Sequence, residues 1–168
     1  MLEAALLVVF PILVAFAGIS DLLTMKIPNH VSILLIIGFG LVGLAAGLSV
    51  ADWGNYLLGG LVVFVPCFAM FALGWVGGGD AKVASAIALW FGFGADLVTF
   101  VVLTAFLGMF LTLGLLFFKN MPILPAFMTR IEWITRLHDP RTGIPYGIAI
   151  AVAALIVYPE TFWFSMLG

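Results

Sequence analysis

The chain has 168 residues, of which 65% are hydrophobic and only 8% charged, and this is the composition of a protein solvated by lipid. A spanning helix needs about 20 mostly apolar residues, so the chain can hold roughly five or six spans and little else. A net charge of −2 gives no basic patch for nucleic acid. The single cysteine, Cys67, excludes a disulfide framework and a cysteine-based zinc site.

Six apolar runs are candidates for membrane-spanning helices. They cover residues 4–20, 31–50, 55–73, 81–93, 97–118 and 144–158. Turn residues and charges fill the breaks between them, at 21–30, 51–54, 74–80, 92–96 and 119–143. The fourth run has only about 13 residues, short of the roughly 17 that a span needs. We therefore predict one all-α membrane-embedded domain over residues 1–168, a bundle of about six transmembrane helices.

The N-terminal run also has a feature of a secretory signal, because Ala15-Phe16-Ala17 follows an apolar stretch. The residues before the apolar stretch include Glu3 and no Lys or Arg, which is untypical of a signal peptide. We therefore expect the first run to be retained as a span.

The charges predict the orientation of the bundle. If all six runs cross the membrane, every basic residue falls on one side, which the positive-inside rule assigns to the cytoplasm. These residues are Lys26, Lys82, Lys119, Arg130, Arg136 and Arg141. The opposite side holds only the acidic residues Glu3, Asp52, Asp96 and Glu160, and we expect the last three to be solvated.

The segment 119–143 is the only polar stretch of any length. Within it, apolar residues recur at roughly helical spacing and alternate with charged ones. The apolar residues are Ile123, Phe127, Ile131, Ile134 and Leu137. This pattern predicts an amphipathic helix on the cytoplasmic membrane surface, which serves either to fix the topology or to meet a substrate.

Asp21 and Asp80 are the acidic residues with catalytic potential. Two complete crossings separate them, so both should lie at the same edge of the membrane, each beside an apolar helix where a carboxylate is poorly solvated. Two neighbouring carboxyl groups that share one proton provide a base to activate water and an acid to protonate a leaving group. This chemistry is peptide hydrolysis without a metal or a cofactor.

Both aspartates also have structural interpretations. Asp80 follows Gly77-Gly78-Gly79, where the missing side chains would let a substrate strand approach, but it could simply N-cap the helix that begins at Ala81. Asp21 could be an exposed residue paired with Lys26. The glycines do not form a phosphate cradle, because the G-x-x-x-x-G-K-[ST] pattern is absent.

Three motifs together resemble the type IV prepilin peptidases of the GxGD class of aspartic proteases. They are Asp21 with Lys26-Ile27-Pro28-Asn29, then Gly77-Gly78-Gly79-Asp80-Ala81-Lys82, and finally Pro145-Tyr146-Gly147. The GxGD element alone is a weak signal. Its combination with the first motif two spans earlier, in order and with matching topology, is a strong one.

The resemblance implies that Asp21 and Asp80 form the catalytic pair. It also implies a set of substrate-binding or supporting residues, namely Lys26, Pro28, Asn29, Gly77, Gly78, Gly79, Lys82, Pro145, Tyr146 and Gly147. The implied partners are the lipid bilayer and prepilins or pseudopilins, which are cut on the cytoplasmic side of the bacterial inner membrane, before their hydrophobic N-terminal stem helix. No cofactor is implied.

Larger members of the family carry a cysteine-rich cytoplasmic insert and also N-methylate the trimmed pilin. The present sequence has no such insert, so we do not expect methyl transfer. Its compact form is most similar to the short peptidases of the Flp (tight adherence) pilus systems, with archaeal preflagellin peptidases as neighbours.

Two other functions are compatible with some of these features. A small proton- or cation-coupled transporter could use Asp21 and Asp80, although transporters usually place such groups near the bilayer midplane and within repeated halves. A non-catalytic membrane scaffold could use the glycines for close helix packing alone. The scaffold predicts that both aspartates are dispensable.

Overall fold

The computed structural model describes the chain except residues 1, 123, 126–127 and 167–168, and describes side chains from residue 8 onward. Its elements are α1 (Leu2–Thr24), α2 (Asn29–Ala45), α3 (Val50–Ala72), α4 (Gly78–Phe91), α5 (Ala95–Lys119), α6 (Glu132–His138), α7 (Tyr146–Val157), the 3-10 helix η1 (Tyr158–Glu160) and α8 (Phe162–Ser165). The all-α prediction is confirmed, since the described residues include no strand.

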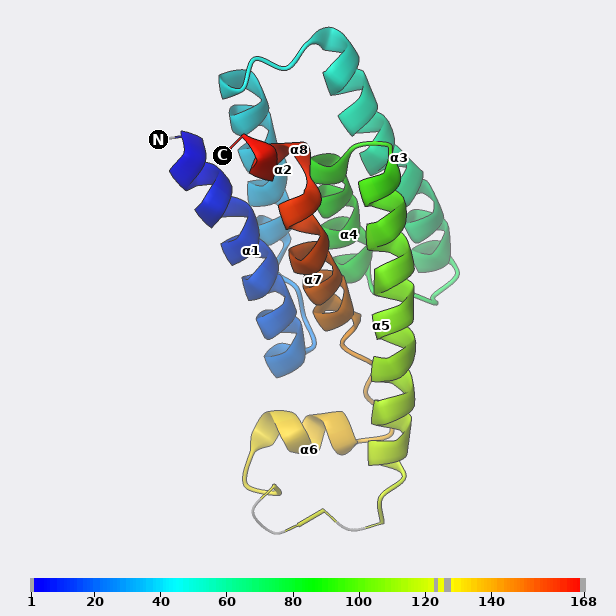
Figure 1. Ribbon diagram of the computed structural model, residues 1–168. Coiled ribbons are helices and arrows are strands. Elements are labelled where there is room, and N and C mark those ends of the chain that lie inside the picture. The colour runs from blue at the N-terminus through cyan, green and yellow to red at the C-terminus, as the bar shows by residue number, and fades with distance from the viewer. Residues whose placement is uncertain (1, 123, 126–127, 167–168) are drawn as a thin grey trace.

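The six longer helices form a bundle in which successive helices run in opposite directions (Figure 1). Helix α7 packs against both α1 and α5, while α4 packs against α2 and α3. The short helix α6 lies crosswise below the bundle, and α8 covers part of its upper end (Figure 1). The C-terminal ends of α1 and α5 and the N-terminal ends of α2 and α7 therefore lie at the lower end of the bundle.

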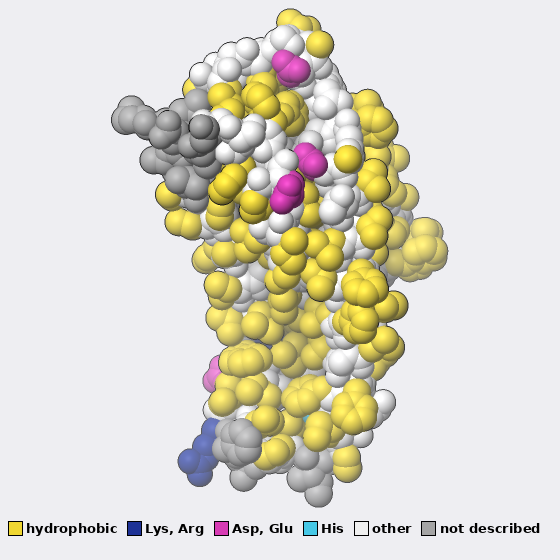
Figure 2. Space-filling view, viewed as in Figure 1, with side chains coloured by type: hydrophobic (Ala, Val, Ile, Leu, Met, Phe, Trp, Pro, Cys, Tyr) yellow, Lys and Arg dark blue, Asp and Glu magenta, His cyan; other side chains and the backbone are white. Residues whose placement is uncertain are grey.

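The outer surface has the character of a membrane protein. Helices α3 and α5 are long and apolar enough to cross a bilayer, and residues 8–24 of α1 and helices α2 and α7 are shorter apolar helices. Hydrophobic side chains dominate the face in Figure 2, and the acidic groups visible there lie mainly at the upper end. Helix α4 has only 14 residues and is largely buried among the others, which explains how so short a run belongs to the bundle.

The turn predicted at residues 51–54 is wrong, because these residues belong to α3. The break lies earlier, at residues 46–49, where Gly47 adopts a φ of 70°. Ser49 and Asp52 form a capping box in which the Ser49 side chain accepts from the Asp52 backbone N–H and the Asp52 carboxylate accepts from the Ser49 backbone N–H. The polar residues that predict a turn in the sequence thus form the first turn of α3.

Buried aromatic side chains connect the helices at the upper end of the bundle by packing and hydrogen bonds. The Trp163 indole N–H donates to the carbonyl of Trp90 at 2.6 Å, and the Trp90 indole N–H donates to the carbonyl of Leu35 at 3.1 Å. Phe10 stacks on Tyr158 with ring centroids 4.2 Å apart. These contacts join α1, α2, α4 and α8, so the end of the bundle opposite to α6 is closed by packing.

Glycine brings α3 and α4 into close contact. A Cβ atom on Gly59 would lie 2.6 Å from the backbone of Gly92, and one on Gly60 would lie 2.6 Å from the Leu89 side chain. Small residues let helix backbones approach in this way in membrane proteins, where packing rather than water drives association. The upper halves of α3 and α4 therefore pack so closely that a side chain larger than that of glycine does not fit at Gly59 or Gly60.

We predict that Gly59→Ala lowers the free energy of unfolding by about 1–3 kcal/mol, because the added methyl group collides with rigid backbone. Gly54→Ala on the same helix is the control, since open space surrounds Gly54 and alanine is the better helix former. Thermal unfolding in detergent, followed by tryptophan fluorescence, measures both variants. Equal midpoints for the two would contradict the tight α3–α4 contact.

Candidate active site

Asp21 lies in the last turn of α1 with its side chain only 5% exposed. Its Oδ2 atom accepts a hydrogen bond of 2.7 Å from the backbone N–H of Gly147, the second residue of α7. The first and the last long helices of the bundle are therefore joined at this carboxylate. The alternative in which Asp21 is exposed is wrong, and Lys26 itself has an exposed side chain.

The loop after α1 is held in a defined shape. The helix ends at Thr24, and the next residue, Met25, adopts the left-handed region at a φ of 56°. The hydroxyl groups of Ser20 and Thr24 both donate to the carbonyl of Lys26, at 2.9 and 3.1 Å. Pro28 then serves as the N-cap of α2 with extended backbone, so the loop reverses the chain within four residues.

Asp80 is the third residue of α4. Gly77 is the N-cap, with extended backbone, and the helix begins at Gly78. The prediction that Asp80 itself could be the N-cap is therefore wrong, because Gly78 and Gly79 already belong to the first turn of the helix. The Asp80 carboxyl lies near the backbone N–H groups of Gly77 and Gly147, where the positive end of the α4 dipole also favours an anion.

The two carboxyl groups come together beside the N–H group of Gly147, which donates to Asp21 and lies near Asp80. They are close enough that the charge on Asp21 opposes a charge on Asp80. Glycine is required at position 147, since a Cβ atom there would lie 2.8 Å from Oδ2 of Asp21. The geometry thus provides a coupled pair of carboxyl groups, which favours one shared proton.

Sequence analysis missed the role of Ile27. Its side chain lies between the N-terminal turns of α4 and α7, because a Cβ on Gly79 would meet Ile27 Cβ at 3.3 Å and one on Gly147 would meet its Cδ1 at 2.8 Å. Ile27 therefore sets the spacing between the helices that carry Asp80 and Gly147. An apolar residue inside an otherwise polar turn, Lys26-Ile27-Pro28-Asn29, was the available signal.

The remaining predicted site residues make contacts with neighbouring helices around Asp21 and Asp80. The Lys82 ammonium donates to the Asn29 side-chain oxygen at 3.0 Å, which links α4 to α2. Gly78 faces the ring of Phe71 on α3. Pro145 is fully buried as the N-cap of α7, and the Tyr146 ring packs on Gly108 of α5, away from Gly147.

The polar segment 119–143 contacts the site from below. Arg136 of α6 donates to the carbonyl of Leu23 in α1 at 2.7 Å, and Lys119 donates to the carbonyl of Thr142 at 2.6 Å. The predicted amphipathic helix is reduced to the seven residues of α6. Leu137 is buried and Ile131 exposed, whereas Ile123 and Phe127 lie outside the described residues.

The chemistry available at this site is that of carboxyl groups. In the part of the chain that the structure describes, no group of three or more His, Cys, Asp or Glu side chains could hold a metal ion. Cys67 on α3 is half-buried. The pair Asp21 and Asp80, with the Gly147 N–H between them, can act as a general base and a general acid on one bound substrate.

Comparison with known proteins identifies the family of the chain. The sequence model of the type IV leader peptidase family matches residues 8–115, well over half of the chain. The match includes α1 to α4 and so contains both Asp21 and Asp80. No curated protein and no solved structure matches the chain. The chain therefore belongs to the type IV leader peptidase family and is a membrane-embedded peptidase.

Proposed function

We propose that the protein is an aspartic endopeptidase that uses Asp21 and Asp80 to remove the leader peptide of Flp-type prepilins at the cytoplasmic face of the bacterial inner membrane. The observation that carries this proposal is the proximity of the two carboxyl groups, with Asp21 bound to the Gly147 N–H and Asp80 near both. Two acidic side chains from separate helices, brought together at one end of an apolar bundle, are costly to retain without a function.

The reaction needs one ionised and one protonated carboxyl group. The ionised group takes a proton from a water molecule, whose oxygen attacks the carbonyl carbon of the scissile bond. The protonated group donates to the carbonyl oxygen, and a proton then passes to the amide nitrogen as the C–N bond breaks. The Gly147 N–H holds Asp21 beside Asp80, so that both groups face the same bound peptide.

The charge distribution supports a cytoplasmic site. All six Lys and Arg residues belong to the lower end of the bundle, at the ends of α1, α4 and α5 or in the segment 119–143. Asp52, Asp96 and Glu160 lie at the opposite end, at the starts of α3 and α5 and in η1. By the positive-inside rule the end that carries Asp21 and Asp80 faces the cytoplasm.

The preference for Flp-type pilins rests on the compact form of the chain. Residues 25–28 join α1 to α2 directly, so no cysteine-rich cytoplasmic domain is inserted there, and the chain has a single cysteine. We therefore propose that it cleaves the leader and does not methylate the product.

We predict that Asp21→Asn and Asp80→Asn each reduce processing by about 10²–10⁴-fold, because asparagine keeps the shape of the side chain but cannot transfer the proton. The measurement is cleavage of a co-expressed Flp-type prepilin, followed by gel shift at matched expression.

Asp52→Asn, at the opposite end of the bundle, is the matched control and should process like the wild type. Retained processing in either site variant would remove that residue from the catalytic pair. Retained processing in both would favour a transporter or a scaffold.

The Gly147 contact gives a second prediction. Gly147→Ala should lower kcat by about 10- to 100-fold with a smaller change in KM, because its methyl group displaces the Asp21 carboxylate, which acts in the chemical step. Gly143→Ala is the control, since open space surrounds Gly143. Purified enzyme and a prepilin peptide give both constants, and equal activity of the two variants would argue against Gly147 as the positioning group.

The orientation can be tested with single cysteines in a Cys67→Ser background. Gly94 and Arg141 are both exposed and lie at opposite ends of the bundle. A membrane-impermeant maleimide should label Gly94→Cys in intact spheroplasts and Arg141→Cys only after the membrane is opened, because the basic end faces the cytoplasm. The reverse pattern would place the two aspartates outside.

A further inference from the structure

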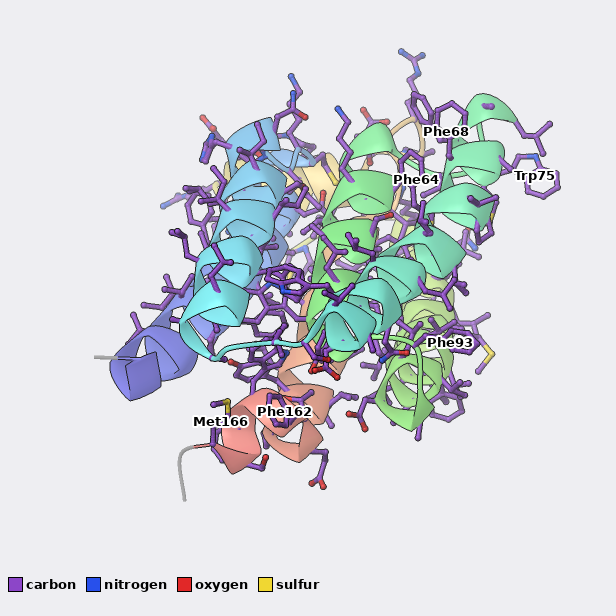
Figure 3. All side chains as sticks on the ribbon, turned by 90° about the horizontal axis from the view of Figure 1, so that it is seen from above. Phe64, Phe68, Trp75, Phe93, Phe162 and Met166 are labelled. Atoms are coloured by element: carbon purple, nitrogen blue, oxygen red, sulfur yellow. The ribbon has the colours of Figure 1, made fainter. Side chains whose placement is uncertain are left out.

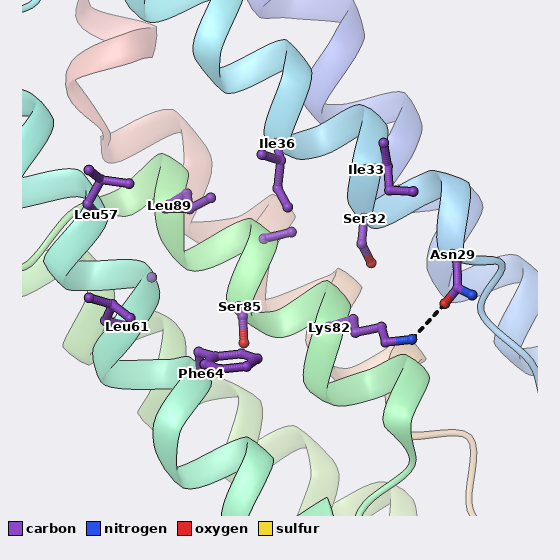
Figure 4. Close-up of a pocket in the computed structure, with 12 residues that line it drawn as sticks. Asn29, Ser32, Ile33, Ile36, Leu57, Leu61, Phe64, Lys82, Ser85 and Leu89 are labelled. Carbon is purple, nitrogen blue, oxygen red and sulfur yellow. Dashed lines mark hydrogen bonds between the residues drawn. The ribbon is translucent and has the colours of Figure 1, made fainter.

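A groove opens on the side of the bundle between α2, α3 and α4 (Figure 4). Its volume is about 540 Å³. Each helix contributes a stripe of residues at i, i+3, i+4 and i+7, from Asn29 to Ile36 on α2, from Leu57 to Phe64 on α3 and from Lys82 to Leu89 on α4. Seven residues of helix rise by about 10 Å, so the stripes line a channel of about two helical turns.

The lining changes in polarity along the channel. The end nearest to the start of α4 carries Asn29, Ser32, Lys82 and Ser85, and the end nearest to the middle of the bundle carries only apolar side chains such as Ile36 and Leu89. At the polar end Lys82 donates to Asn29 (Figure 4). An occupant must therefore present a polar part beside Lys82 and an apolar part beside Leu89.

The groove is open toward lipid. Ile33, Leu61 and Phe64 on its rims are exposed, Leu61 by 55%. Seen from above, α3 leans away from the bundle at the end that carries Phe68 and Trp75, and Trp75 points outward (Figure 3). A membrane-inserted segment can consequently enter sideways, without passing through water.

The polar end is connected to the catalytic pair by the glycine turn. Lys82 follows Asp80 by two residues on α4, so it lies on another face of the same helix turn. Between the two faces lies the N-terminus of α4, where Gly77 is exposed, while Gly78 packs against the Phe71 ring and Gly79 against Ile27. An extended peptide can cross over Gly77 from the groove to Asp80.

We propose that this groove holds the first turns of the apolar stem helix of the substrate, while the cleavable segment crosses the exposed Gly77 to reach Asp21 and Asp80. Backbone groups outside a helix need hydrogen-bond partners at membrane depth, and Asn29, Ser32, Lys82 and Ser85 supply them where the stem helix begins. The apolar stripes then contact the side chains of one face of that helix. This inference rests on the proposed function, because it names where that substrate binds.

Cross-linking tests binding without catalysis. In an Asp80→Asn, Cys67→Ser background, Leu61→Cys places the only thiol in the groove, and Leu58→Cys, three residues earlier on the same helix and outside the groove lining, is the matched control. The partner is a co-expressed Flp-type precursor with a single cysteine in the first two turns of its apolar segment. Disulfide formation is read as a gel shift after mild oxidation.

We expect Leu61→Cys to form the cross-link and Leu58→Cys to form little. Absence of the cross-link from Leu61→Cys, or equal cross-linking of both, overturns the groove as the docking site, even if the wild type cleaves the precursor. Failure of the wild type to cleave the precursor would instead overturn the proposed function.

Filling the groove gives a second measurement. Leu61→Trp in the wild-type background should raise KM by about tenfold with little effect on kcat, because the indole occupies space needed by the stem helix, whereas Leu58→Trp should leave both unchanged. If Leu61→Trp cleaves normally but loses a phospholipid that co-purifies with the wild type, the groove is a lipid cleft and the proposal is overturned.

Discussion

The hydrogen bond from the Gly147 N–H to Asp21 joins the two ends of the chain, and the geometry of the site depends on it. Gly147 lies in the first turn of α7, Asp21 in the last turn of α1, and Asp80 in the first turn of α4 lies near the same N–H group. Backbone N–H groups in the first turn of a helix have no partner within the helix. The fold uses these free groups to hold two carboxyl groups, each of which would otherwise be poorly solvated at the edge of a membrane.

Close backbone approach makes this arrangement possible. Ile27 touches Gly79 on one side and Gly147 on the other, so it acts as a spacer between α4 and α7. The hydroxyls of Ser20 and Thr24 fix the loop that presents Ile27. The distance between the two carboxyl groups is therefore set by packed side chains and glycine backbone rather than by the carboxyl groups themselves, which allows the pair to remain close when one of them is charged.

Part of this arrangement follows from the sequence alone. The apolar runs identify the long helices, and an even number of crossings places Asp21 and Asp80 at one edge. The start of α3 could not be predicted, because Ser49 and Asp52 form a capping box from residues that equally suit a turn. The hydrogen bond to Gly147 and the contacts of Ile27 depend on which helices meet in space, and a single sequence does not specify such tertiary neighbours.

The shape of the lateral groove follows from how α3 is attached to α4. At the upper end Gly59 and Gly92 let the two backbones touch, whereas at the lower end the ring of Phe71 lies between α3 and Gly78. A ring at one end and no side chain at the other make the helices diverge toward the catalytic end (Figure 3). The packing that stabilises the upper bundle thus accompanies the divergence on which the proposed substrate path depends, and both follow from where the sequence places glycine and phenylalanine on α3.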